Sequence, residues 1–213
     1  MLGSEDAYGY LIEVAGDWGY TSVQGPTGPC CLGGPRNRSQ DQLVMSTAIH
    51  EAGHAVAAFH AQIPIAAVDI ECPPPCGQCG APRSSGRNQG LHLGVGTADN
   101  TLRMLAAGVE AELLWTERQG PVADAERWAI EAGGIGDQGL ARDLVDSLRP
   151  VGWPKLDYGP PGSAPRSWNW PHQRQRARTT VELWWPQIEA VADRLVCHRR
   201  LDPASILEVL TRQ

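Results

Sequence analysis

The chain has 213 residues and a formal net charge of −6 at neutral pH, with 18 basic and 24 acidic side chains. This length suits one domain with tails, and no nucleic-acid partner is expected, because that would need a basic face. The sequence contains no run of about 18 apolar residues, so no membrane-spanning helix is expected. The first residues lack the positive start and apolar stretch of a secretory signal, and we therefore expect a cytoplasmic protein.

The N-terminal part, residues 1–38, is expected to be a weakly ordered tail. Residues 24–38 are dense in Gly and Pro and show no periodicity, which is typical of a linker. A short strand is predicted within the tail at residues 8–14. The remaining residues, 39–213, are expected to form one domain.

The first helix is predicted from Ser39 or Asp41 to residue 62, since either side chain can cap it and Pro64 lies just beyond its end. Apolar residues recur at three- and four-residue steps across this segment, which makes one apolar stripe. Gly53 is out of place there, because glycine costs about 1 kcal/mol against alanine in a helix interior. We expect it to allow another backbone to approach closely.

Two short strands are predicted next, at residues 65–71 and 90–96, on either side of a Cys-, Pro- and Gly-rich loop at 72–90. Residues 149–175 are rich in Pro and Trp and are predicted to form a second long, irregular loop. Helices are predicted at residues 99–118, 123–132, 137–148, 176–198 (bent at Pro186) and from Asp202 to 210. The expected fold class is therefore mainly α with a small β-sheet (α+β).

The first helix carries a candidate metal motif. His50 and His54 stand four residues apart, with Glu51 beside the first, in the H-E-x-x-H pattern of zinc hydrolases. On a helix both imidazoles project from one face and can bind one metal ion, and Glu51 can take a proton from water on its open side. A hydrolytic zinc needs a third protein ligand; the candidates are His92, Glu110, Glu112, Asp137, Asp143 and His172.

The sequence around this motif resembles that of the peptidase domain of the FtsH family of zinc proteases. The resemblance begins with AIHEAGHAVAA at residues 48–58, IP at 63–64 and VDI at 68–70. LAAGVEAEL at 105–113 is similar to the family's GG-R-x-AEE helix, with Val109 in place of Arg. GIGDQGLA at 134–141 is similar to the family's TGASNDLxxAT segment, and Asp137 and Ala141 keep the spacing of its Asp and Ala. The resemblance covers residues 43–148 and 178–211.

This resemblance implies a zincin-like HExxH helix packed in a helical bundle, a Zn2+ cofactor and hydrolysis of a polypeptide substrate. It also implies that Asp137 is the third zinc ligand, with Glu51 as general base. The residues alone leave Asp137 two roles, ligand or helix N-cap, with Asp143 the next candidate ligand. The family's ATPase module and membrane-spanning helices are missing from this chain, so an ATPase partner or a homo-oligomer is an open question.

Two more features near the motif are predicted from the sequence: the role of Glu112 and a strand that could hold the substrate. Glu112 is expected on the helix that packs beside the zinc helix, either as a carboxylate that holds a histidine ring or as a surface charge. In zinc peptidases an edge strand near the metal often holds the peptide by strand addition. Residues 91–95 are the candidate for that strand.

The cysteines of the first loop suggest a second metal. Cys72, Cys76 and Cys79 have a spacing that can form a structural zinc knuckle, with His92 or another Cys as the fourth ligand. The alternative is a flexible loop with ordinary thiols, because a three-Cys set lacks an obvious fourth member.

The preferred function is a zinc-dependent endopeptidase. The alternative is a non-catalytic, zinc-stabilised protein-binding module that uses the Cys loop and the Trp-rich loop as contact surfaces. Glu51 favours catalysis, because a purely structural site has no need of that carboxylate. A fourth protein ligand near His50 would favour the binding module, because structural zinc sites are closed.

Overall fold

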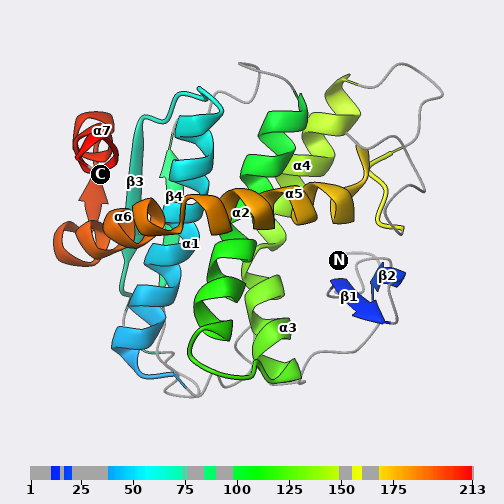
Figure 1. Ribbon diagram of the computed structural model, residues 1–213, viewed down its shortest axis with the longest axis horizontal. Coiled ribbons are helices and arrows are strands. Elements are labelled where there is room, and N and C mark those ends of the chain that lie inside the picture. Colours follow the sequence, from blue (N-terminus) through cyan, green and yellow to red (C-terminus); the bar gives the residue numbers. More distant parts are fainter. Residues whose placement is uncertain are drawn as a thin grey trace.

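The computed structural model describes residues 11–14, 17–20, 38–73, 75, 84–89, 98–148, 155–159 and 168–212. These residues form a mainly helical structure with a small antiparallel sheet, as the α+β prediction states (Figure 1). Within these ranges, no helix has both the length and the apolar character needed to cross a bilayer.

Helix α1 (Gln40–His60) is the central element and agrees with the predicted helix. A capping box fixes its start: the Ser39 side chain accepts from the Gln42 amide, and the Gln42 side chain accepts from the Ser39 amide. The prediction that Gly53 allows another backbone to approach closely is confirmed. A Cβ there would lie 2.7 Å from the carbonyl oxygen of Ala107 and 2.7 Å from the Cβ of Ala111, both on α2 (Ala98–Glu117).

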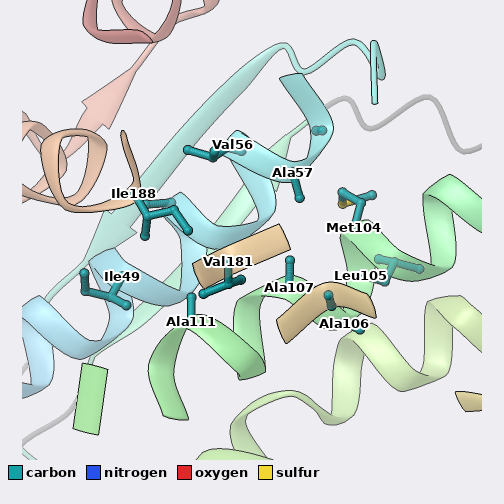
Figure 2. Packing of buried hydrophobic residues seen from close by; sticks show 14 of the residues in the cluster. Ile49, Val56, Ala57, Met104, Leu105, Ala106, Ala107, Ala111, Val181 and Ile188 are labelled. Atoms are coloured by element: carbon teal, nitrogen blue, oxygen red, sulfur yellow. The ribbon is translucent and has the colours of Figure 1, made fainter. Parts of the chain in front are cut away.

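Two further helices lie across this pair. Helices α5 (Trp170–Leu183) and α6 (Trp185–His198) follow each other and pack on α2 and α1 respectively, as Figure 1 shows. Helices α3 (Asp124–Gly133) and α4 (Ile135–Leu148) pack against the other side of α2, and α7 (Pro203–Thr211) packs on α6. Figure 2 shows the core between them, where Ile49 and Val56 of α1 meet Ala107 of α2, Val181 of α5 and Ile188 of α6.

The sheet has the order β4-β3-β5, so strand β4 (Ser85–Gln89) lies at one edge. Strand β3 (Ala67–Glu71) pairs antiparallel with β4 and with β5 (Arg200–Leu201), which follows α6. The register sets Val68 opposite Asn88, and both side chains face α1. Asp69 faces the other side, where it accepts a hydrogen bond from Arg87.

The prediction of a loop at 72–90 is wrong in part, because β4 lies inside this segment. The sequence of β4, SGRNQ, has no apolar or β-branched residue, so nothing in its composition signals a strand. Backbone pairing with β3 makes it one. The strand predicted at 90–96 lies outside the described residues.

Strand β1 (Leu11–Val14) lies within the strand predicted at 8–14 and pairs with β2 (Asp17–Tyr20) in a hairpin. The Trp-rich segment differs from the prediction. The loop predicted at 149–175 ends earlier, because α5 begins at Trp170 with Asn169 as its cap and Pro in its first turn. The bend predicted at Pro186 is a break into two helices at Trp184.

A buried ion cluster joins three helices. Arg174 of α5 donates through Nε to Glu110 of α2 (2.5 Å) and through Nη1 to Glu131 of α3 (2.6 Å), with all three side chains almost fully buried. Burial raises the pKa of Glu131, and the Arg174 guanidinium opposes that effect. For Arg174, burial acts to lower the pKa, but the two carboxylates outweigh it and raise the pKa.

Removing Arg174 should therefore destabilise the fold strongly. We expect Arg174→Leu to lower the free energy of unfolding by about 3–5 kcal/mol, because two buried carboxylates lose their partner. Arg178→Leu is the control: its partners Glu117 and Glu182 are partly exposed, so it should cost no more than about 1 kcal/mol. Urea unfolding measures both, and equal losses would contradict this account of the cluster.

Candidate metal centre

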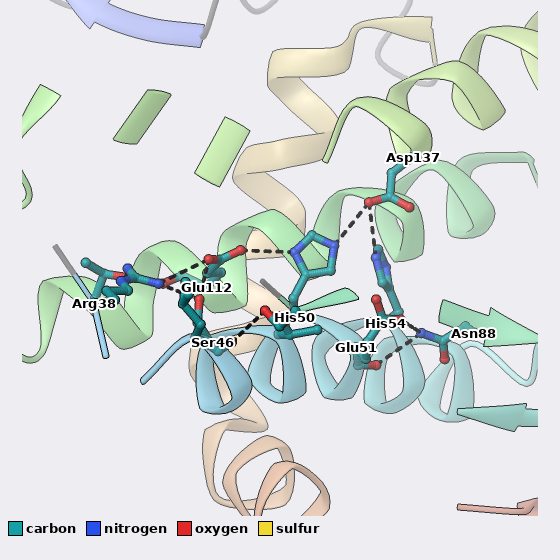
Figure 3. A network of polar contacts seen from close by, with 12 residues as sticks. Arg38, Ser46, His50, Glu51, His54, Asn88, Glu112 and Asp137 are labelled. Carbon is teal, nitrogen blue, oxygen red and sulfur yellow. Dashed lines mark hydrogen bonds and ion pairs between the residues drawn. The ribbon is translucent and has the colours of Figure 1, made fainter. Parts of the chain in front are cut away.

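The two histidines of α1 and the carboxylate of Asp137 meet at one point (Figure 3). Oδ2 of Asp137 lies 3.2 Å from Nε2 of His50 and 3.2 Å from Nε2 of His54. One ligand atom from each of the three residues lies within 4.8 Å of the others. Asp137 lies in the first turn of α4, which begins at Ile135, so it does not hold the N-cap position considered as its alternative.

These separations suit a zinc ion. Zinc bonds to imidazole nitrogen and carboxylate oxygen at about 2.0–2.2 Å in tetrahedral sites, which places neighbouring ligand atoms about 3.3–3.6 Å apart. The two 3.2 Å separations, from Oδ2 of Asp137 to Nε2 of His50 and of His54, are close to that range. The three side chains therefore fit the donor set of a zinc site with three protein ligands.

The outer nitrogen of each imidazole also has a partner. Nδ1 of His54 donates to the carbonyl oxygen of Met104 (2.9 Å), which can only accept, so the proton of a neutral ring lies on Nδ1. Nδ1 of His50 lies 3.4 Å from Oε2 of Glu112. Both rings therefore keep Nε2 for a metal ion, in the arrangement by which outer hydrogen-bond partners orient zinc-binding histidines.

Glu112 belongs to a buried polar network that reaches the start of the domain. Its Oε1 accepts from the Ser46 hydroxyl and from Nη1 of Arg38 (3.3 Å). Arg38 also donates to Thr116 (2.7 Å) and to Glu126 (2.8 Å). Glu112 is only 3% exposed, which is not the environment of the surface charge considered for it.

Charge compensation decides the protonation of the three candidate ligands without metal. Burial acts to lower the pKa of His50 and His54, but the Asp137 carboxylate, with Glu112 beside His50, outweighs it and raises both. Burial acts to raise the pKa of Asp137, and the imidazoles outweigh it and lower that pKa well below its usual range. A metal ion would replace protons held between these groups, so its affinity falls as pH falls.

Gly108 makes room for the imidazoles. A Cβ at this position of α2 would lie 2.6 Å from Nε2 of His50 and closer still to Nε2 of His54. Any side chain there would displace the nitrogens that face Asp137. Sequence reasoning assigned no role to this glycine, although a glycine inside a helix was the available signal.

Glu51 lies beside the histidines and faces the sheet. Its Oε2 accepts a 2.5 Å hydrogen bond from Nδ2 of Asn88 on β4, and its aliphatic part lies against Gly86. The residue is 6% exposed, and burial raises the pKa of its carboxyl group. A raised pKa suits a group that both accepts and returns a proton near neutral pH.

The other candidates for the third ligand do not join this group. Asp143 is exposed on α4, Glu110 binds Arg174, and His172 lies in the first turn of α5. His92 lies outside the described residues. Of the predicted second metal site, Cys72 is exposed and accepts a hydrogen bond from Nη1 of Arg199 (3.3 Å), whereas Cys76 and Cys79 lie outside the described residues, so the knuckle stays a prediction.

No family model matches the chain, and no curated protein matches it either. The functional argument therefore rests on the geometry of the site and on the residues that form it.

The role of Gly108 can be tested by adding one methyl group. We expect Gly108→Ala to lower zinc affinity by at least about ten-fold, because the outer support of zinc ligands commonly contributes that much. Gly139→Ala on α4 is the matched control, because a Cβ there meets nothing within 4 Å. The control should keep its zinc affinity, and unaltered affinity in Gly108→Ala would contradict the geometry. Competition with a chromophoric chelator measures both.

Proposed function

We propose that this protein is a zinc-dependent endopeptidase that resembles the peptidase domain of the FtsH family and hydrolyses peptide bonds of flexible polypeptides. The observation that carries the proposal is the convergence of His50, His54 and Asp137, with Glu51 next to them in sequence. Two imidazoles and one carboxylate are the ligand set of a class of zinc peptidases.

The number of ligands favours catalysis over a structural site. In the described part of the chain, the group of metal-ligating atoms has three members and no fourth His, Cys, Asp or Glu joins it. Structural zinc sites have four protein ligands, whereas catalytic sites have three and leave one position for water or substrate. This count is the reason to prefer the peptidase over the non-catalytic binding module.

When bound, zinc supplies a Lewis acid that activates water near neutral pH and polarises the scissile carbonyl. The protein supplies the proton transfers. Glu51 accepts the proton of the attacking water and then delivers it to the leaving amine. The burial that raises the pKa of Glu51 favours this second step, because the carboxylic acid then forms more readily.

Strand β4 is the proposed place for an extended substrate. The candidate strand at 91–95 lies outside the described residues, but β4 is at the edge of the sheet that the described residues form and contacts Glu51 through Gly86 and Asn88. An edge strand presents unpaired backbone groups to which a peptide can add as a further strand. A polypeptide bound in this way would pass beside the general base.

Replacing Glu51 tests the proposed reaction directly. Glu51→Gln should lower kcat for casein or a fluorogenic peptide by about 10²–10⁴-fold, the usual contribution of a general acid–base group. Its zinc content should stay near that of the wild type, because Glu51 is not among the converging ligands. Hydrolysis at the wild-type rate would contradict the role of Glu51 as base.

A second pair of variants tests the third ligand. Asp137→Ala should weaken zinc binding by more than about a hundred-fold, beyond the loss typical of outer partners. Asp143→Ala, an exposed carboxylate on the same helix, should leave zinc binding unchanged. Equilibrium dialysis followed by metal analysis measures both, and the reverse ranking would transfer the ligand role to Asp143.

A further inference from the structure

The inner face of β4 forms a wall against Glu51. Gly86 and Asn88 share this face because they are two residues apart on a strand, and both contact the Glu51 side chain. Arg87 and Gln89 alternate with them and contact Asp69 on the other face of the sheet. The two inner residues are the ones that touch the proposed base.

Asn88 binds Glu51 through its amide nitrogen. Nδ2 donates to Oε2 of Glu51 at 2.5 Å and also approaches the main-chain oxygen of Glu51 at 3.3 Å. The main-chain oxygen can only accept a hydrogen bond, and so can the Glu51 carboxylate when it is ionised. The Asn88 amide must therefore present its nitrogen to them. The same donor thus connects the side chain and the backbone of the proposed base.

The other end of the amide has no partner among the described residues. Oδ1 of Asn88 is buried and accepts no hydrogen bond in the described part of the chain. Asn88 also stands opposite Val68, which is fully buried. A polar residue on the apolar side of a strand with an unpaired oxygen breaks the usual pattern, and such departures from local rules occur at functional sites.

Gly86 leaves the space that Glu51 occupies. A Cβ at position 86 would lie 2.7 Å from Oε1 of Glu51 and closer still to its Cγ. The carboxylate is therefore confined by β4 on one side and held by the Asn88 amide at its other oxygen. Neither residue is a candidate metal ligand.

We propose that Asn88, with Gly86, is a positioning residue that fixes the Glu51 carboxylate in the orientation needed for proton transfer. This inference rests on the proposed peptidase function. Asn88 acts through Glu51 and leaves zinc binding to His50, His54 and Asp137. Its loss therefore lowers kcat without changing KM or zinc content.

The kinetic experiment compares two amides on the same strand. Asn88→Leu removes the donor, and we expect kcat to fall about ten- to hundred-fold, the range for a hydrogen bond to a charged group. Asn88→Asp keeps the shape but presents a second carboxylate to Glu51, and should lower kcat at least as far. Gln89→Leu is the control: it removes an amide that contacts Asp69 on the outer face and leaves the main-chain groups available for strand addition, so it should keep the wild-type kcat.

Two further measurements separate positioning from folding. The zinc content of Asn88→Leu should match that of the wild type, because Asn88 is not among the converging ligands. Its midpoint of thermal unfolding should fall by no more than about 4 °C, because removing the buried unpaired oxygen offsets part of the cost of leaving Glu51 without its donor. Equal kcat in Asn88→Leu and Gln89→Leu would overturn the proposal. A fall in kcat accompanied by an equal loss of zinc or of stability would overturn it as well, because the role would then be structural.

A measurement on the metal-free protein keeps this inference separate from the peptidase proposal. Nitrogen-15 NMR should place one Asn88 side-chain N–H signal, identified by its loss in Asn88→Leu, downfield of ordinary Asn amides, and Glu51→Ala should return it. An unshifted signal overturns the contact whatever the activity. If the wild type and Glu51→Gln are equally inactive while the signal is shifted, the peptidase proposal fails and the contact stands without its catalytic consequence.

Discussion

The site depends on how closely α1 and α2 approach each other. Gly53 lies against the backbone of Ala107, and Gly108 lies against the imidazole nitrogens of His50 and His54. Small residues on both helices bring the two backbones together, and this contact turns one face of α1 toward α2. The histidines extend from this contact toward the first turn of α4. Asp137 reaches them there because α4 packs on the same helix, α2.

Charge compensation explains why so many ionisable groups are tolerated in the interior. Buried ionised groups are costly unless they are paired. Three of the buried acids have an arginine as partner: Arg38 contacts Glu112, and Arg174 contacts Glu110 and Glu131. The two imidazoles and Asp137 compensate one another only while the histidines carry protons, which is why the pKa of each histidine is raised in the absence of metal. A divalent cation between these three side chains would supply that positive charge at neutral pH.

The helices and the metal motif were predictable because both are encoded locally. Periodicity and caps located α1, α2 and α7, and the HEAGH segment identified His50 and His54, whereas Asp137 was singled out among the candidate ligands by the resemblance to the FtsH family. Strand β4 was not predictable, because SGRNQ carries no apolar pattern. The start of α5 was missed although Asn169 as cap and Pro171 in the first turn give the same kind of signal that located α7. The roles of Arg38 and Asn88 arise from contacts with residues distant in the sequence. Such contacts leave no trace in local spacing.

Glu51 differs from the other buried acids in a way that bears on function. Glu110, Glu112 and Glu131 are each held by an arginine, whereas the partner identified for the Glu51 side chain is the neutral amide of Asn88. An arginine there would hold the carboxylate ionised and so oppose proton uptake. A neutral donor orients the group while leaving its pKa raised by burial. Orientation without an arginine partner is what the proposed role of Glu51 as a general base requires.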